Sequence, residues 1–191
     1  MTKKELRFIY KEKRASLPFQ QIEKANDLIL INFQKINLPF INCVHTYLAS
    51  SKLKEADTGN ILRYLAFKNP ELKIVAPSID VGTNLMKHFC INDDTNFAIN
   101  SYGIEEPVSG ENVNTDEIDL VLLPLLAYDK SGFRVGYGKG FYDRFLKDCK
   151  PETIKIGLSF FEAADEISDI NSFDVPLDYC VTPSSIYSFV K

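Results

Sequence analysis

The segment Asp119-Leu-Val-Leu-Leu-Pro124 is apolar on both faces of an extended chain and is bounded by residues that favour turns. Runs of this kind are typical of strands buried at the centre of a parallel sheet. The stretch Tyr128-Asp-Lys-Ser-Gly-Phe-Arg-Val-Gly-Tyr-Gly-Lys-Gly-Phe-Tyr-Asp143 follows, and a helix is predicted from about residue 140 to residue 149. A strand, a glycine-rich loop and a helix in this order indicate an α/β protein.

The remaining chain continues the alternation of strands and helices. Thr2 and Glu5 have the spacing of a capping box, which predicts a helix to about Leu17, before Pro18. A second helix contains Ile22 and ends before Pro39, and Thr58 is expected to cap a third. Further strands are predicted at residues 44–49, 73–77, 85–90, 154–160 and 179–182, and surface loops at 92–100 and 109–117. We therefore expect a three-layer α/β/α sandwich around a Rossmann-like, mostly parallel sheet.

Composition limits the class of protein. A chain of 191 residues fits a single domain over residues 1–191, and its net charge of −4 disfavours bulk binding of nucleic acid. It has neither a signal-peptide pattern at its start nor an apolar run long enough to span a membrane. We expect a cytoplasmic monomer. The separated cysteines predict neither disulfides nor a thiolate metal site; they are Cys43, Cys90, Cys149 and Cys180.

The loop before the last predicted helix carries the residues best suited to chemistry. Gly136, Gly138 and Gly140 allow backbone amides to face an anion, and the following helix N-terminus adds partial positive charge. Arg134 and Lys139 supply cations for phosphate oxygens, and the Asp143 carboxylate suits Mg²⁺. The loop therefore predicts a site for ATP and a metal ion, the alternative being a glycine-rich turn with solvated charges.

Two common phosphate-binding motifs do not match this loop. A P-loop requires glycine where this chain has Phe133, and serine or threonine where Gly140 follows Lys139. The glycine spacing G-x-G-x-G also differs from the G-x-G-x-x-G of dinucleotide-binding folds.

The pattern resembles the 5-formyltetrahydrofolate cyclo-ligases, also named methenyltetrahydrofolate synthetases, over nearly the whole chain. The most specific element is Leu123-Pro124-x3-Tyr128-Asp129-x2-Gly132-x-Arg134-x-Gly136-x-Gly138-Lys139-Gly140-x-Tyr142-Asp143. Weaker elements occur in family order: Lys3-x3-Arg7, Glu55-x-Asp57-Thr58, Gly103-Ile-Glu-Glu-Pro107 and Phe173-Asp174-Val-Pro-Leu-Asp178. Relatives more often carry arginine or a small residue at position 137 and tyrosine at position 141.

This resemblance implies an ATP- and Mg²⁺-dependent cyclisation of 5-formyltetrahydrofolate to 5,10-methenyltetrahydrofolate with release of ADP and phosphate. ATP phosphorylates the formyl oxygen, nitrogen 10 attacks the activated carbon, and phosphate leaves. Arg134 and Lys139 would be catalytic, Asp143 and Asp174 would bind Mg²⁺, and Leu48 and Glu55 would contact folate together with Tyr137, Gly138, Lys139, Gly140 and Phe141. The residues implied to bind ATP are Lys3, Arg7, Arg134, Gly136, Tyr137, Gly138, Lys139, Gly140, Phe141 and Tyr142.

Several alternatives remain at the level of the sequence. Glu55 also fits a solvated loop acid, Asp174 a turn residue, and Lys3 and Arg7 a solvated basic helix face that continues to Arg14. The histidines, His45 and His88, fit core or surface strand positions. Competing functions are another ATP- or sugar-phosphate-binding α/β enzyme, a non-catalytic folate- or nucleotide-binding protein, and a nucleic-acid binder.

Overall fold

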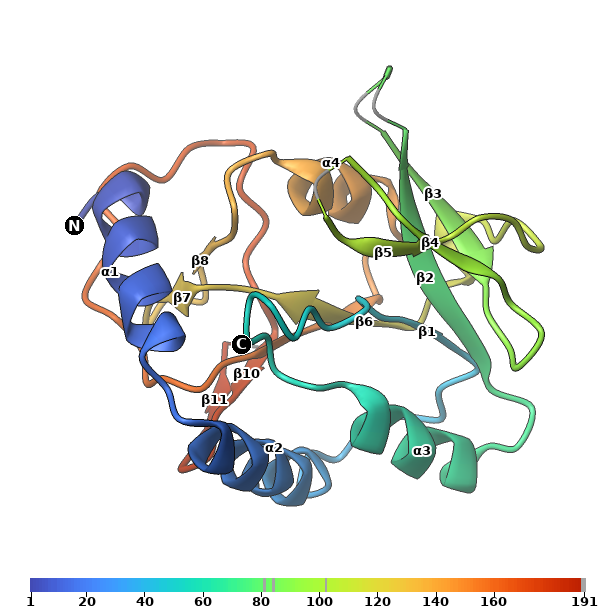
Figure 1. Ribbon diagram of the computed structural model, residues 1–191, viewed down its shortest axis with the longest axis horizontal. Coiled ribbons are helices and arrows are strands. Elements are labelled where there is room, and N and C mark those ends of the chain that lie inside the picture. Colours follow the sequence, from blue (N-terminus) through green and yellow to red (C-terminus); the bar gives the residue numbers. More distant parts are fainter. Residues whose placement is uncertain (81, 84, 102, 190–191) are drawn as a thin grey trace.

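The apolar run predicted as a central strand forms β6 (Leu120–Pro124), in the middle of a sheet that has seven strands among the described residues (Figure 1). The computed structural model describes residues 1–80, 82–83, 85–101 and 103–189. In spatial order the strands are β11 (Ile186–Ser188), β10 (Tyr179–Val181), β9 (Ile154–Leu158), β6, β1 (Cys43–His45), β2 (Lys73–Asp80) and β3 (Leu85–Cys90). All neighbours pair in parallel except the edge strands β3 and β11, which confirms the mostly parallel sheet.

The other elements surround this sheet. The helices are α1 (Lys3–Ala15), α2 (Phe19–Phe33), α3 (Gly59–Lys68) and α4 (Phe141–Asp148), with a short 3-10 helix η1 (Thr115–Glu117). Two small antiparallel pairs complete the described elements: β4 (Phe97–Ile99) with β5 (Glu105–Pro107), and β7 (Ala127–Tyr128) with β8 (Arg134–Val135).

Strand β6 is buried on both faces because successive side chains point to opposite sides of the sheet. Leu120 and Leu122 pack in the cluster that includes residues of α2 and α3. Val121 and Leu123 pack in the cluster that includes Phe145 of α4. Figure 1 shows α2 and α3 below the sheet and α4 above it. The arrangement is therefore the expected three-layer α/β/α sandwich.

Helix α1 lies across the carboxyl end of β6. It starts with the predicted capping box, in which Thr2 and Glu5 each accept from the other's backbone amide. Leu6 and Tyr10 are buried against β7 and β8 in a third apolar cluster. This packing places the first turns of α1 beside the glycine-rich loop that follows β8 (Figure 1).

Some predicted loops contain short regular elements. Residues 92–100 include β4 and residues 109–117 include η1; both elements lie at the surface as predicted, but neither segment is a loop throughout. Strand β4 gives no alternating apolar signal because all its residues are exposed. Thr58 occupies the N-cap position of α3 as predicted, but its hydroxyl donates to the backbone oxygen of Tyr47 and does not cap the helix.

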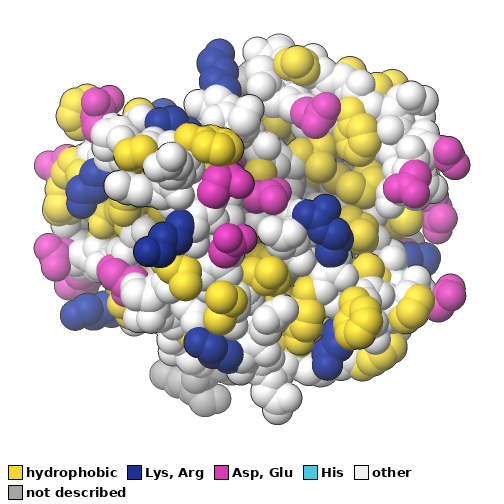
Figure 2. Space-filling model, turned by 60° about the horizontal axis from the view of Figure 1, so that its bottom comes forward, with side chains coloured by type: hydrophobic (Ala, Val, Ile, Leu, Met, Phe, Trp, Pro, Cys, Tyr) yellow, Lys and Arg dark blue, Asp and Glu magenta, His cyan; other side chains and the backbone are white. Residues whose placement is uncertain are grey.

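All four cysteines are free. In the described part of the chain, no helix combines the length and apolar character that a membrane crossing requires. On the face shown in Figure 2, basic and acidic side chains are interspersed and form no single basic patch.

The two histidines form a buried pair between the sheet and α4. His45 Nε2 lies 3.2 Å from His88 Nδ1, and both rings pack on Phe145. Burial lowers the pKa of His45 well below its usual value, and the neighbouring His88 lowers it further. Burial also lowers the pKa of His88 to about 4, against a smaller opposing effect of Asp148. Both histidines are therefore core residues that are neutral in the folded protein.

This pair should make the fold less stable at mildly acidic pH. The folded-state pKa values lie below the unfolded value of about 6.5, so the unfolded chain binds more protons as the pH falls. The free energy of unfolding should decrease from about pH 6.5 towards pH 4, by about 1–2 kcal/mol for each histidine between pH 7 and pH 5. His88→Phe keeps a ring in place and should remove about half of that decrease in urea titrations. An unchanged decrease in this variant would assign the pH dependence to other groups.

Candidate functional site

A pocket of about 500 Å³ opens at the carboxyl ends of β1 and β6. It lies between α1, the segment after β1, the ends of β2 and β3, strand β5 and the glycine-rich loop. Ligand sites in open α/β sheets lie beyond the carboxyl ends of the strands, which matches this position.

All residues that the sequence assigned to a ligand line this one pocket. They are Lys3, Arg7, Leu48, Glu55, Arg134, Gly136, Tyr137, Gly138, Lys139, Gly140, Phe141, Tyr142, Asp143 and Asp174. They come from segments far apart in the sequence, and the fold brings them together.

Helix α1 and the glycine-rich loop form one wall. Arg7 Nε donates to the backbone oxygen of Gly136 at 2.8 Å. Gly138 has a φ of +93°, and a Cβ placed there would come within 3.2 Å of Arg7 Cζ. Only glycine combines this backbone conformation with such a close approach of the guanidinium. The solvated reading of Arg7 is therefore wrong.

Arg134 is the buried cation of the site. Its Nη2 lies 2.8 Å from Asp143 Oδ1, and its Nη1 donates to the backbone oxygen of Val175. Burial lowers the pKa of Arg134, while the carboxylates of Asp143 and Asp174 act in the opposite direction. Because a guanidinium does not lose its proton in proteins, Arg134 is a fixed positive charge in the pocket wall.

Lys3 and Asp174 form a second ion pair, with 2.5 Å between Lys3 Nζ and Asp174 Oδ2. Both side chains are only about one-seventh exposed, at 15% and 14%. Asp174 Oδ2 also accepts from the backbone amide of Asn171 at 2.7 Å. The pair therefore links the start of α1 to the segment before β10, so Asp174 is more than a turn residue.

The carboxylates offer a limited set of metal ligands. The carboxylates of Asp143 and Asp174 both raise the pKa of Arg134, and both residues line the pocket. Among the described residues, no group of three or more His, Cys, Asp or Glu side chains could hold a metal ion. Mg²⁺ in nucleotide sites is usually held by one or two carboxylates together with substrate phosphates. The side chains therefore fit a Mg²⁺ ion that binds with a nucleotide, and they do not form a protein cage for a metal alone.

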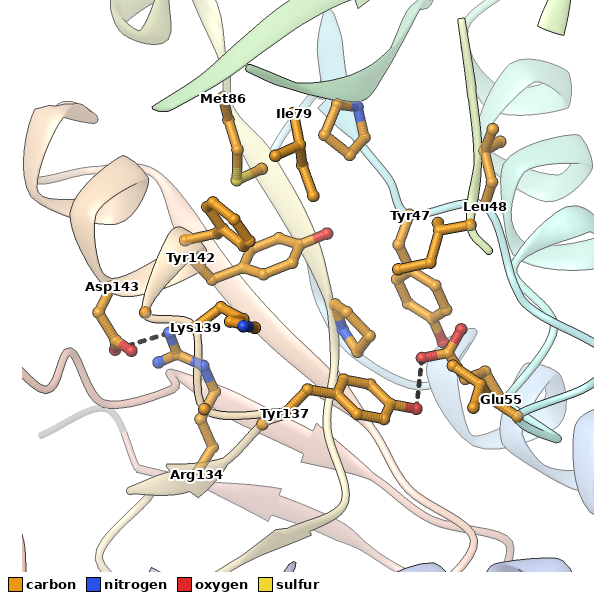
Figure 3. Close-up of a pocket in the computed structure, with 18 of the residues that line it drawn as sticks. Tyr47, Leu48, Glu55, Ile79, Met86, Arg134, Tyr137, Lys139, Tyr142 and Asp143 are labelled. Atoms are coloured by element: carbon orange, nitrogen blue, oxygen red, sulfur yellow. Dashed lines mark hydrogen bonds and ion pairs between the residues drawn. The ribbon is translucent and has the colours of Figure 1, made fainter. Parts of the chain in front are cut away.

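Lys139 lies near the tip of the loop, directly before α4. Gly140 has a φ of +68° and occupies the N-cap position of that helix. In Figure 3, the Lys139 side chain points into the pocket between the rings of Tyr142 and Tyr137. The exposed lysine and the positive end of α4 therefore add to the charge of Arg7 and Arg134.

The opposite side of the pocket is apolar, and most of it was not predicted from the sequence. Besides Leu48, the apolar lining residues are Leu53, Pro77, Ile79, Met86 and Ile104, and β5 adds the acidic residues Glu105 and Glu106. Figure 3 shows Ile79 and Met86 directed towards the ring of Tyr142. Burial raises the pKa values of Tyr47 and Tyr142, which keeps both hydroxyls protonated at neutral pH. Apolar residues at strand ends resemble core residues, so no motif distinguishes them.

Glu55 faces the glycine-rich loop from the segment after β1. The Tyr137 hydroxyl donates to Glu55 Oε1 at 2.9 Å, and the Ser50 amide donates to Oε2 at 2.9 Å (Figure 3). Burial and the charge of Glu55 raise the pKa of Tyr137, so its hydroxyl is protonated at neutral pH. The reading of Glu55 as a solvated loop acid is therefore wrong.

Comparisons with known proteins agree with this geometry. The family model described as the 5-formyltetrahydrofolate cyclo-ligase family matches residues 1–183. The 5-formyltetrahydrofolate cyclo-ligase of Escherichia coli is 26% identical, with 95% of this chain and 100% of that protein aligned. The NMR structure of Aquifex aeolicus 5,10-methenyltetrahydrofolate synthetase has a TM-score of 0.81 at 26% identity, covering 100% of this chain and 94% of that one.

Local similarity is higher in several relatives that align over a shorter segment. The 5-formyltetrahydrofolate cyclo-ligase of Mycoplasma genitalium is 36% identical over 36% of this chain and 42% of its own length. In this match and two others of similar strength, the chain covers less than two thirds of the relative's length. The family model, by contrast, extends from the capping box of α1 to the end of β10. The chain therefore belongs to the 5-formyltetrahydrofolate cyclo-ligase family, whose members are named as ligases.

Proposed function

We propose that this protein catalyses the ATP- and Mg²⁺-dependent cyclisation of 5-formyltetrahydrofolate to 5,10-methenyltetrahydrofolate, releasing ADP and phosphate. The observation that carries the proposal is that one pocket is lined both by the cationic side chains of Lys3, Arg7, Arg134 and Lys139 and by a group of apolar side chains. A nucleotide phosphate chain and a flat, partly apolar folate need these two environments next to each other. Membership of the family supports the same substrate.

The cationic side would hold ATP. Lys3 and Arg7 from α1, Arg134 and the loop residues 136–142 supply positive charge and backbone amides for the phosphates. Phosphoryl transfer depends mainly on positioning and on neutralising the charge of the transferring group. Arg134 and Lys139 would act catalytically in this way, as preorganised charges beside the γ-phosphate.

The apolar side would hold the folate. Leu48 and the loop residues 137–141 would contact the ring system, and the Glu55 carboxylate can accept two hydrogen bonds from the edge of a pterin. Phe141 supplies a ring face without the hydroxyl that relatives more often carry. The formyl group would then lie near the boundary between the apolar and the cationic sides.

The chemistry needs no nucleophile from the protein. The γ-phosphoryl group moves to the formyl oxygen and ADP leaves; nitrogen 10 then attacks the formyl carbon and loses its proton, and phosphate departs with the former formyl oxygen. The pocket contains no histidine among the described residues that line it, because His45 and His88 form the neutral pair in the core. Charge and exclusion of water are the contributions that these side chains can make.

Asp143 and Asp174 are proposed as the residues that hold Mg²⁺, which would neutralise phosphate charge when bound. Asp143→Asn and Asp174→Asn each remove one charged oxygen ligand, so the Mg²⁺ concentration for half-maximal rate should rise about tenfold. Asp178→Asn is a matched control, because Asp178 also pairs with a lysine, Lys155 at 2.8 Å, but does not line the pocket. Equal Mg²⁺ titrations for the three variants and the wild type would leave both aspartates with structural roles only.

The proposed function is tested by mixing the protein with 5-formyltetrahydrofolate and Mg-ATP. We expect the absorbance of the methenyl product to appear together with one equivalent of ADP. Tight binding of either compound without turnover would favour a non-catalytic folate- or nucleotide-binding protein. Turnover of ATP that does not depend on folate would favour another ATP-dependent enzyme.

Three further properties concern the protein in the cell. We propose a monomer that acts in the cytoplasm and binds no nucleic acid, in keeping with its acidic net charge of −4. The relative from Arabidopsis thaliana is named as mitochondrial, so location differs within the family. Fractionation and light scattering would test these properties.

A further inference from the structure

Arg14 is a buried charge for which the proposed reaction gives no direct role. Its residue is 7% exposed, and it continues the buried face of α1 that includes Leu6 and Tyr10. It is not among the described residues that line the pocket. A buried guanidinium is costly unless its donors are satisfied, so its partners indicate why it is there.

Arg14 donates two hydrogen bonds to protein groups. Its Nη1 donates to the backbone oxygen of Leu125 at 3.2 Å, and its Nη2 donates to the hydroxyl of Tyr137. Arginine can only donate hydrogen bonds, so the Tyr137 oxygen must accept this one. The single hydroxyl proton of Tyr137 is then directed to Glu55 Oε1, at 2.9 Å. The direction of both bonds is fixed by the chemistry of the groups.

Glu55 uses both carboxylate oxygens as acceptors. Oε1 accepts from Tyr137 and Oε2 accepts from the Ser50 amide. Each carboxylate oxygen can accept about two hydrogen bonds, so one further acceptor position remains on each oxygen. Two parallel N–H donors, such as the ring N–H and exocyclic amino group of an aminopyrimidinone, match that arrangement.

The segment that carries Glu55 is also held against α1. Lys54 has a φ of +47°, and its Nζ donates to the backbone oxygens of Ala15 at 2.5 Å and Leu17 at 2.7 Å. The Glu55 amide donates to the Ser50 oxygen at 3.2 Å, which closes the turn. Both ends of the chain of hydrogen bonds are therefore anchored on the same helix end.

We propose that Arg14 and the Tyr137 hydroxyl are positioning residues that orient the Glu55 carboxylate for the aminopyrimidinone edge of the substrate. Arg14 polarises the Tyr137 hydroxyl, and the hydroxyl holds Glu55, which lines the pocket, in one rotamer. This arrangement acts on folate affinity and not on the phosphoryl transfer. The inference rests on the proposed function, because it assigns the folate to the apolar side.

The test compares Tyr137→Phe, Glu55→Gln and the double variant, with Tyr10→Phe as the matched control. Tyr10→Phe removes the hydroxyl of a buried tyrosine on α1, and Tyr10 is not among the described pocket-lining residues. Tyr137→Phe should raise the KM for 5-formyltetrahydrofolate at least about tenfold, as expected for losing one hydrogen bond to a charged group. The kcat and the KM for ATP should change less than about twofold, since the ring remains.

The double variant separates positioning from independent contacts. If Tyr137 acts through Glu55, the double variant should bind folate no more weakly than Glu55→Gln alone. Arg14→Met should reproduce the folate defect of Tyr137→Phe, and Lys13→Met, an exposed cation of the same helix, should not. Multiplicative losses in the double variant, or a normal folate KM in Tyr137→Phe, would overturn the inference.

Calorimetric titration of each variant with 5-formyltetrahydrofolate alone distinguishes the inference from the proposed function. If the wild-type protein binds folate, but the losses of folate affinity in Tyr137→Phe and Glu55→Gln multiply in the double variant, only the positioning role is refuted. A wild-type protein that neither binds nor converts 5-formyltetrahydrofolate would refute the proposed function and the positioning role together.

Discussion

Lys139→Ala is expected to lower kcat/KM for ATP by about two to three decades, the usual cost of one preorganised charge at a reacting oxyanion. Lys139 is exposed at the end of the glycine-rich loop, so the free energy of unfolding should change by less than about 0.5 kcal/mol. Steady-state kinetics with ATP varied at saturating folate, combined with a urea titration, would measure both effects.

Lys147→Ala is the matched control for Lys139→Ala. Lys147 is an exposed lysine of α4 that lies 4.3 Å from the ring centroid of Phe173 and does not line the pocket. Lys147→Ala removes one positive charge from the same region as Lys139→Ala does. Any loss of activity in Lys147→Ala therefore measures long-range electrostatic effects alone. Equal activity of the two variants would place the phosphate site elsewhere.

Arg134→Ala should abolish most activity and also destabilise the fold. The Arg134 side chain is 6% exposed, and its removal leaves Asp143 and the Val175 oxygen without their donor. Breaking a buried ion pair in this way costs about 3 kcal/mol of unfolding free energy. For a chain of this size, Tm should fall by roughly 10 °C. The loss of kcat/KM should again be about two to three decades.

Two further variants separate stability from catalysis at Arg134. Lys155→Ala breaks the ion pair between Lys155 and Asp178, whose side chains are 17% and 27% exposed. Neither residue lines the pocket, so this variant should have a lower Tm and an unchanged kcat. Arg134→Ala combined with Asp143→Ala removes both partners and should recover part of the lost stability, while activity stays low. A fully active Arg134→Ala protein at a temperature where it is folded would contradict the catalytic role.

The sequence predicted the centre of the fold because its signals there are local. Residues 120–124 are apolar without interruption, and the turn residues around them define the strand. The glycine-rich loop was assigned to a ligand because positive φ values and anion contacts require glycine. The sequence pattern also grouped Lys3, Arg7 and Glu55 with this loop through their order in the family motif, although only the fold brings them together.

The apolar side of the pocket was missed for a physical reason. Strand β2 was predicted to end at Pro77, and proline lacks the amide that a sheet interior needs. The pairing of β2 with β1 already ends at Val75, so Pro77 is tolerated, and β2 continues alongside β3 to Asp80. That extension carries Ile79 into the pocket. The pairing of β2 with β3 therefore shapes this apolar part of the pocket, and the local sequence pattern does not reveal that pairing.

The alternative of a solvated basic helix face that continues to Arg14 was wrong, because Arg14 is buried. Leu6, Tyr10 and Arg14 are spaced four residues apart and lie on one buried face of α1. The spacing of these three residues can be read from the sequence, but arginine is usually exposed, so the sequence alone did not indicate that Arg14 is buried. A long cationic side chain can be buried when its donors find acceptors, here the Leu125 oxygen and the Tyr137 hydroxyl.

The most direct test of the proposed reaction follows the formyl oxygen. 5-Formyltetrahydrofolate labelled with heavy oxygen in the formyl group would be converted with Mg-ATP, and the released phosphate analysed by mass spectrometry. If ATP activates the formyl oxygen in this pocket, each phosphate should carry one heavy oxygen atom from the folate. Unlabelled phosphate accompanying full conversion to the methenyl product would contradict phosphorylation of the formyl oxygen, and with it the role assigned to the cationic side of the pocket.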